Sequence, residues 1–451
     1  MSQSSVPAAR PVIPAGRDLT LDLARVACVL VVVFVHLVLV GVGRNPDGSP
    51  LIDSPVTGSR WVAPVSWVAE IMPLFFVVGG FAARTGWESA QARGESPGRF
   101  VRSRLARLAR PAMPLYCFLA AALLVVKVIG LDPALVSAVE VPVGSVLWFL
   151  GAYLLVQSLA PWMIRWHERA PWLTLTLLLA AALVVDVIRL VVGIWFLGLG
   201  KIDLNGYGTG DELFGIPNVA FVWLFAQQIG FCLKDGWFSR LAWWQLLGVI
   251  ALGFLAIGAL VGFGSYSTSM LSNQWPPTTP IAILAPIQAA LFTLPRRPLT
   301  ALMRLGWMQA VVFAAGSRLM TIYLWHVTAI VVLTGIQLLL PLPMPAPGSA
   351  VWWLTRPILM VAVFALVWVI SLWTARLEKP MPEPAGTRVS PAATVVAVVL
   401  FVLPSIGISA YGLDLPLAIG AVLCTAASLL LIVPRGSATT ERSTTAGHLA
   451  A

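Results

Sequence analysis

Charged residues are scarce in this chain, because Asp, Glu, Lys and Arg together make up 11% of its 451 residues. A soluble domain carries about 25% of these residues. This deficit excludes a soluble globular protein. Cysteine is also rare, and the four cysteines all lie in apolar runs without metal-ligand spacing: Cys28, Cys117, Cys232 and Cys424. We interpret them as small packing residues and expect neither a disulfide framework nor a metal site.

Several familiar catalytic motifs are missing as well. We find no Walker loop, dinucleotide fingerprint, HExxH motif or GxSxG nucleophile elbow in a credible context. The sequence therefore predicts no tightly bound cofactor. The formal net charge of +10 is compatible with nucleic-acid binding, but the positions of the basic residues explain it better, and we expect no nucleic-acid partner.

Long apolar runs are what the chain has instead, and 59% of its residues are hydrophobic. Runs near 18 residues or longer are typical of membrane-spanning helices, and they are too long and uniform for barrel strands. We predict an all-α polytopic membrane protein. The expected spans are 19–41, 62–83, 112–130, 144–161, 172–195, 217–234, 241–262, 280–294, 317–340, 351–375, 392–411 and 415–433.

The expected domain organisation is a ten-helix core followed by two additional helices. Polar tails occupy 1–16 and 434–451, the core is 17–375, and a Pro-rich linker, 376–391, leads to the two additional spans in 392–433. We find no convincing repeat between two halves of the chain. The first span is too long, and lacks the cleavage site, for a signal peptide.

Lys and Arg are distributed unevenly between the two sides of this topology. With both termini in the cytoplasm, the exceptions among the 29 basic residues are few: Arg44, Arg60, Lys201 and Arg356 outside, and Lys127 and Arg189 within spans. This asymmetry follows the positive-inside rule for a multi-pass protein of the cell membrane. Contact with anionic lipid headgroups is expected to reinforce it.

The first span carries a line of ionisable residues. Arg25 and His36 are eleven positions apart, which is close to three helical turns, so they lie on one face with Asp18 and Asp22. Their rise of roughly 16 Å is about half the thickness of the hydrocarbon core. A salt-bridged helix entry explains the aspartates equally well. A histidine inside a membrane helix needs a polar surrounding, and a neutral imidazole there is a natural general base.

A basic segment precedes the third span. It runs from Arg99 to Pro114 and alternates arginines with apolar residues, as expected of an amphipathic helix at the membrane surface. Positive-inside topology accounts for the cluster as a whole. Arginine also binds phosphates bidentately, so the sequence predicts a site for a phosphate-bearing cosubstrate at four of these residues: Arg102, Arg104, Arg107 and Arg110.

The second span contains Glu70 and the run MPLFFVVGGF, in which Pro73, Gly79 and Gly80 permit a kink and close helix packing. We interpret the glycines as packing residues. Glu70 is either a site residue or a carboxylate at the membrane interface.

Three further features lie in later spans. His326 follows Tyr323 by three positions on one helical face, and a packing role is as well supported as a role in the site. Trp148 begins the fourth span, where an interfacial aromatic anchor is the simplest interpretation. Asp186 and Arg189, three apart in the fifth span, are expected to pair with each other.

Taken in order, these segments resemble the integral-membrane acyltransferase-3 family. RDLTLDLAR followed by His36 is similar to its first-helix signature, MPLFFVVGGF to its second-helix motif and RSRLARLARP to its basic loop. LWFL is similar to the start of its fourth helix and IYLWH to its late tyrosine–histidine motif. The resemblance covers roughly 17–375. It departs from the family at Gly79, where serine is common, and in the two additional spans.

The resemblance implies transfer of an acyl group, with acetyl the expected one, from cytoplasmic acyl-CoA to a hydroxyl of a carbohydrate, lipid-linked glycan or secondary metabolite. It assigns the central role to His36 and a supporting role to Arg25, and the basic segment contacts the CoA phosphates. With the residue-based reading, the expected catalytic set is His36, Arg25 and Asp22. Supporting roles are expected for Asp18, Glu70, Trp148, Tyr323 and His326.

Two other functions remain open from the sequence. A transporter or flippase for a glycan, lipid or small metabolite would also use twelve spans and an intramembrane histidine. The missing internal repeat and the ordered motifs count against it. A catalytically silent membrane partner would explain the substitution at Gly79, but the Arg25–His36 spacing counts against that reading.

Overall fold

The computed structural model describes residues 18–45, 48–56, 59–131, 133–195, 212–263, 265–340, 344–379 and 389–433. Both predicted tails lie outside these residues, as do most of the Pro-rich linker and residues 196–211 between two of the expected spans.

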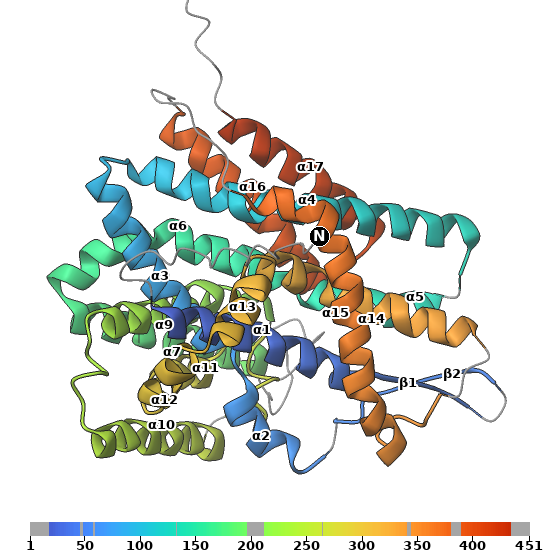
Figure 1. Cartoon of the computed structure of the whole chain (residues 1–451), viewed down its shortest axis with the longest axis horizontal. Coiled ribbons are helices and arrows are strands. Elements are labelled where there is room, and N and C mark those ends of the chain that lie inside the picture. The colour runs from blue at the N-terminus through green and yellow to red at the C-terminus, as the bar shows by residue number, and fades with distance from the viewer. Residues whose placement is uncertain are drawn as a thin grey trace, which may run out of the picture. The chain divides into compact units, whose positions relative to one another are not determined.

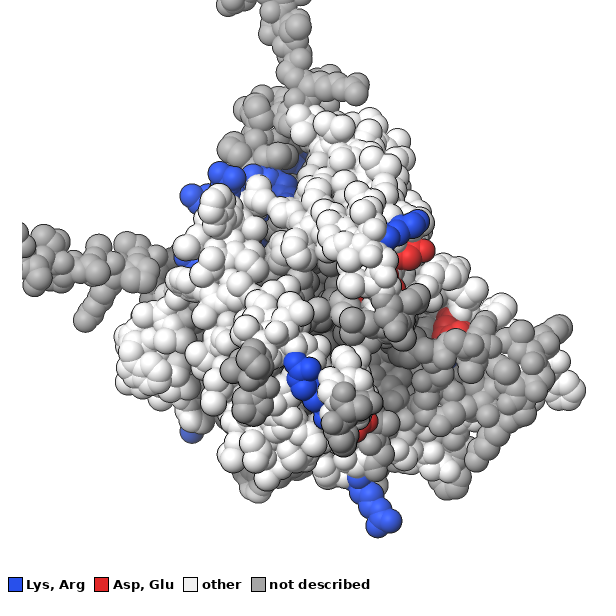
Figure 2. Space-filling view, turned by 90° about the vertical axis from the view of Figure 1, so that its right-hand side faces the viewer, with Lys and Arg blue, Asp and Glu red and all other residues white. Residues whose placement is uncertain are grey.

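Helices account for most of the described chain. In this part of it, eleven helical segments are long and apolar enough to cross a membrane, or twelve if one bent pair counts as a span. Figure 2 shows that the described surface on one face carries few charged side chains, as a lipid-facing surface requires. The predicted class, an all-α polytopic membrane protein, is confirmed.

The chain divides into two compact units. The first comprises Met1–Ser89 and Leu159–Ala375, and the second comprises Ala90–Ser158 and Arg376–Ala451. Helices of the first unit (Figure 1) are α1 (Leu19–Leu39), α2 (Val62–Ala69), α3 (Met72–Ala92), α7 (Pro171–Trp195), α8 (Glu212–Gly215), α9 (Asn218–Lys234), α10 (Trp243–Phe263), α11 (Thr279–Thr293), α12 (Arg296–Leu302), α13 (Gly306–Gly316), α14 (Leu319–Leu339) and α15 (Ala350–Glu378). Helices of the second unit are α4 (Pro97–Ile129), α5 (Pro133–Ser145), α16 (Pro391–Tyr411) and α17 (Leu415–Ile432), and α6 (Trp148–Arg169) passes from the second unit into the first.

One small hairpin interrupts the helices of the first unit. Strands β1 (Gly41–Arg44) and β2 (Pro50–Asp53) pair antiparallel directly after α1, with Gly41 opposite Asp53. The sequence pattern did not predict it, because four-residue strands beside a long apolar helix leave almost no periodic signal.

The second predicted span is broken into α2 and α3. The break falls at Glu70 and Ile71, and Pro73 is the second residue of α3. Proline is tolerated there because the first backbone N–H groups of a helix have no partner within it. Pro73 therefore begins a helix instead of kinking one.

Helices α3 and α9 approach each other closely through two glycines. A Cβ atom on Gly80 would come closer than 3.0 Å to the backbone carbonyl of Gln227, and one on Gly230 closer than 3.0 Å to that of Val77. Only glycine permits this spacing, since the atoms it meets are backbone. The packing interpretation is confirmed for Gly80.

The segment around 280–316 differs from the expectation. Helix α11, which we predicted as a span, has only 15 residues and is almost wholly buried in the first unit. The following segment, expected as a simple cytoplasmic connection, forms α12 and α13, which are bent by 94° at their junction. Helix α13 packs against α1, so this segment helps to enclose the first helix.

In the second unit, the predicted surface helix and third span form one continuous helix, α4, with Pro111 and Pro114 inside it. Helices α16 and α17 pack along α4 (Figure 1). The hydroxyls of Tyr116 and Ser405 are 2.9 Å apart, and Ser409 donates a hydrogen bond to the Gly144 carbonyl of α5. The two additional helices are therefore integral to this unit.

Substitution of Gly80 by alanine should destabilise the protein. The added methyl group meets backbone atoms of α9, so either helix must shift, and overpacking of this kind costs about 1–3 kcal/mol. A thermal unfolding measurement in detergent should show a lower midpoint by several degrees. Gly262→Ala is the matched control, because nothing lies within 4 Å of that position in α10. Equal midpoints for the two variants would contradict the packing role.

Candidate functional site

Helix α1 places the predicted line of ionisable residues on one side of a membrane-spanning segment. Asp18 caps the helix, since its carboxylate accepts from the backbone N–H of Thr20 at 3.0 Å. The apolar run that follows contains only Asp22, Arg25 and His36 as ionisable residues other than cysteine. Their common face is turned toward the interior of the first unit, where α13 and α14 contact α1.

The two aspartates have different partners. Arg25 Nη1 lies 3.8 Å from Asp22 Oδ1, whereas Asp18 forms an ion pair with Arg296 of α12. Asp22 is therefore the aspartate of α1 that pairs with Arg25. Asp18 instead fixes the start of α1 and joins it to α12.

His36 is half-buried near the end of α1. Its Nδ1 lies 2.8 Å from the carbonyl oxygen of Val32. A carbonyl can only accept, so Nδ1 carries the proton and donates it. In the neutral ring, Nε2 then keeps its lone pair, which is the form that a general base requires.

His326 of α14 faces His36. The two ring centroids are 5.0 Å apart in an edge-to-face arrangement with planes at 76°. His326 is fully buried, and its Nδ1 donates to the Tyr323 carbonyl at 2.6 Å. Its Nε2 has no hydrogen-bond partner among the described residues. The Tyr323 ring is also buried, with its centroid 5.7 Å from that of His326.

This histidine pair is the centre of the candidate site. Both Nδ1 atoms are engaged by carbonyls of their own helices, so both rings have the same tautomer, with Nε2 as acceptor. Two such nitrogens can bind hydroxyl protons of a ligand or water. Sequence spacing alone could not predict the pairing, since the two residues are 290 positions apart.

Glu70 lies in a separate hydrogen-bond network of the first unit. Its carboxylate is buried and accepts from the Met72 backbone N–H and from Gln274 Nε2, each at 3.1 Å. Gln288 of α11 donates to the Glu70 carbonyl and accepts from Leu74 N–H at 2.7 Å. These hydrogen bonds stabilise the chain where it breaks between α2 and α3. None of the described contacts of Glu70 involves His36 or His326. Glu70 is therefore not exposed to water, and its position relative to the membrane interface stays a prediction.

The four arginines of α4 belong to the second unit and point in different directions. Arg107 is exposed, Arg102 is buried, and Arg104 stacks over the Phe100 ring at 4.8 Å. Arg110 donates to the Lys379 carbonyl at 2.9 Å. Because successive residues of a helix are rotated by about 100°, Arg104, Arg107 and Arg110 lie on one side of α4 and Arg102 lies away from that side.

Trp148, also of this unit, is buried against Phe149 and does not form an exposed interfacial anchor.

Comparison with known families shows which family the chain belongs to. The family model described as "Acyltransferase domain" (Acyl_transf_3) matches residues 18–372. The chain belongs to the acyltransferase-3 family. No curated protein and no solved structure matches the chain significantly. Family membership supports a membrane acyltransferase over a transporter, and the matched region contains every site residue that we predicted.

Two polar networks of this acyltransferase were not predicted. Asp186 accepts from Asn218 Nδ2 at 2.8 Å, from Tyr266 Oη at 3.0 Å, and from the N–H and hydroxyl of Thr279 at 2.8 and 2.7 Å. Direct pairing with Arg189 was expected instead. Arg189 is buried within electrostatic range of Asp186, and their direct pairing stays a prediction. The only sign of this network in the sequence was a carboxylate inside an apolar span, which needs polar partners.

The second network surrounds His167 at the end of α6. Its Nδ1 is 2.8 Å from Gln228 Oε1 and its Nε2 is 3.1 Å from Asp235 Oδ2, which also pairs with Arg84 at 2.8 Å. These contacts join α3, α6 and α9. His167 lies at the edge of an apolar run, where polar residues are usually exposed, so the sequence offered no reason to predict this network.

Variants at Asp18 should separate its two contacts. Asp18→Ala removes both the cap and the ion pair and should destabilise the protein by about 1 kcal/mol. Asp18→Asn keeps a capping oxygen and should cost less, because a half-exposed ion pair contributes only about 0–1 kcal/mol. Thermal unfolding midpoints in detergent measure the difference. Equal losses for both variants would mean that the pair with Arg296 outweighs the cap.

Proposed function

We propose that this protein transfers an acyl group, with acetyl the expected one, from acyl-CoA to a hydroxyl group of an acceptor. The acceptor class is a carbohydrate, a lipid-linked glycan or a small metabolite, and the site of action is the cell membrane. The observation that carries this proposal is the His36–His326 pair, in which both rings present an unprotonated Nε2 inside a membrane acyltransferase.

In the proposed reaction, Nε2 of His36 accepts the proton of the acceptor hydroxyl as its oxygen attacks the thioester carbonyl. The tetrahedral intermediate collapses with cleavage of the carbon–sulfur bond. The CoA thiolate leaves and takes the proton back from His36, which yields the ester and free CoA thiol. His326 Nε2 provides a second hydrogen-bond acceptor that positions a hydroxyl group of the acyl-accepting substrate, since this buried nitrogen has no partner among the described residues.

Arg25 acts at a distance from this chemistry. The rise from Arg25 to His36 is roughly 16 Å, which exceeds the reach of an arginine side chain. Stabilisation of the oxyanion at His36 by Arg25 is therefore disfavoured. Orientation of the donor fits better, with Asp22 holding the guanidinium in place.

The arginines of α4 are proposed to bind the phosphates of the donor. Exposed Arg107 and half-buried Arg104 are suited to bidentate contacts with phosphate oxygens. The uneven distribution of Lys and Arg supports a cytoplasmic position for this segment and for both termini, where acyl-CoA is available.

His36→Ala should abolish acyl transfer without unfolding the protein. Loss of a general base lowers a rate by about 10²–10⁴-fold. Transfer of label from radiolabelled acetyl-CoA to extracted acceptors in membranes measures this. Phe34→Ala is the control on the same helix, because Phe34 is 44% exposed on the opposite face and should leave activity unchanged. Wild-type transfer by His36→Ala would overturn the proposed role of His36.

The double variant Arg104→Gln, Arg107→Gln should raise the KM for acetyl-CoA and leave kcat nearly unchanged. The expected increase is about tenfold, since each lost charge-assisted contact weakens donor binding. Arg93→Gln is the matched control, because Arg93 is exposed in the same unit and already pairs with Glu95 at 2.9 Å. An unchanged KM in the double variant would mean that the donor phosphates bind elsewhere.

A further inference from the structure

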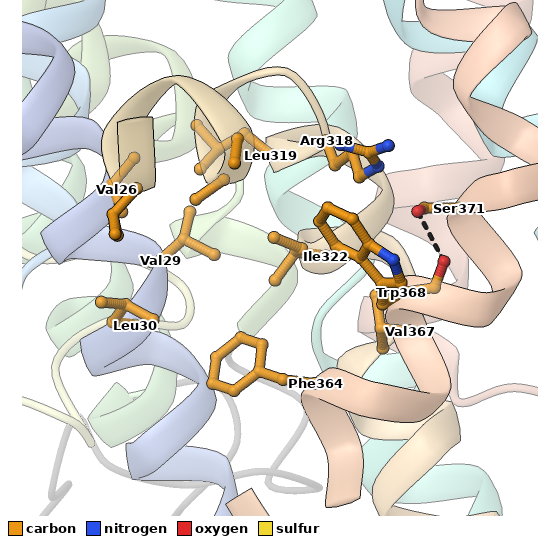
Figure 3. A pocket seen from close by; sticks show the side chains of 13 residues that line it. Val26, Val29, Leu30, Arg318, Leu319, Ile322, Phe364, Val367, Trp368 and Ser371 are labelled. Carbon is orange, nitrogen blue, oxygen red and sulfur yellow. Dashed lines mark hydrogen bonds between the residues drawn. The ribbon is translucent and has the colours of Figure 1, made fainter. Parts of the chain in front are cut away.

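An apolar groove lies beside the histidine-bearing helices of the first unit. It has a volume of about 300 Å³ and is lined by residues of α1, α13, α14 and α15. In Figure 3, Val26, Val29 and Leu30 of α1 lie across the groove from Phe364 and Trp368 of α15. We call it the α1–α15 groove.

The groove is open along one side. Leu30, Val311 and Trp368, which line it, are 40%, 53% and 45% exposed. These residues belong to apolar helices, and α1 and α15 are long enough to span a membrane. The opening is therefore reached from the lipid and not from bulk water.

The Arg318 side chain lies at one end of the groove, and no carboxylate among the described residues pairs with it. The Arg318 guanidinium stacks on the Trp368 ring at 3.8 Å, and its Nη1 makes only a long contact of 3.4 Å with the Ser317 hydroxyl. Its Nε is buried without a hydrogen-bond partner, and Arg318 has no carboxylate partner within the described residues. The other polar side chain of the lining, Ser371, donates its hydrogen to the Trp368 carbonyl at 2.6 Å.

These features define the chemistry of an occupant. An apolar lining favours an alkyl chain, whereas the two amides of a pantetheine arm would lose their hydrogen bonds there. The guanidinium with free N–H groups requires an anion, and phosphate is its best match. The geometry points to one anionic glycerophospholipid from the surrounding leaflet, with an acyl chain in the α1–α15 groove and its phosphate on Arg318.

This lipid contacts the two helices that carry the histidine pair. Val29 precedes His36 by seven residues on the same face of α1, and Ile322 precedes His326 by four residues on α14. The occupant thus fills the seam between α1 and α14 roughly 6–10 Å along the helix axes from the two rings. The site does not depend on the proposed reaction.

Lipid retention by the purified full-length protein tests the proposal. The protein is exchanged into detergent with equal amounts of phosphatidylglycerol and phosphatidylcholine, and bound lipid is counted by native mass spectrometry. We expect one phosphatidylglycerol on the wild type and roughly tenfold less on Arg318→Gln, because the charge-assisted contact is lost. Ala314→Trp, which fills the groove, should lose the lipid as well.

Two variants serve as matched controls. Arg356→Gln removes another arginine that stacks on a tryptophan, Trp352 at 4.1 Å, but lies outside the groove. Ala310→Trp adds the same bulk to an exposed position of α13 that does not line the groove. Both should retain phosphatidylglycerol at the wild-type level, which shows that neither charge loss nor added bulk is enough.

Three results would overturn the proposal. The first is equal phosphatidylglycerol retention by Arg318→Gln and the wild type. The second is equal retention of phosphatidylcholine and phosphatidylglycerol by the wild type, which would mean that Arg318 does not select an anionic lipid over a zwitterionic one. The third is displacement of the lipid by palmitoyl-CoA together with loss of palmitoyl-CoA binding in Ala314→Trp, which would assign the groove to the acyl donor.

Discussion

A polar side chain inside a membrane-spanning helix is stable only where another polar group or water meets it, because hydrocarbon offers no hydrogen bonds. This constraint determines how the first unit is assembled. Asp186 is met by three residues from outside its own helix, and Glu70 is met by Gln274. The histidine pair satisfies the same requirement only in part, since His326 Nε2 has no hydrogen-bond partner among the described residues. This nitrogen can accept a hydrogen bond from a ligand, and the proposed site is built on that property.

Close backbone packing complements these polar contacts. Gly80 and Gly230 bring α3 and α9 together, and α9 carries the Gln228 and Asp235 region that holds His167. In the second unit, α16 and α17 lie beyond the family-matched residues yet pack on α4, the helix of the proposed phosphate-binding arginines. The additional helices therefore contribute to the packing of α4 within this unit.

The proposed chemistry divides along α1. Its first turns carry charged residues, since Arg25 pairs with Asp22 and Asp18 pairs with Arg296. Its last turns carry the neutral imidazole of His36. Charged groups suit the handling of a charged donor, whereas a neutral base suits a reaction that excludes water.

The helical class, most of the span positions and the Arg25–His36 face follow from the sequence by itself, because apolar length and helical periodicity are local properties. The glycine packing of α3 was also predicted from neighbouring residues, whereas the cap at Asp18 was not. Tertiary structure alone decided that His326 faces His36, that Glu70 is buried, and that α12 and α13 bend against α1. These contacts join residues far apart in the chain, and no local pattern encodes which polar groups of two helices will meet.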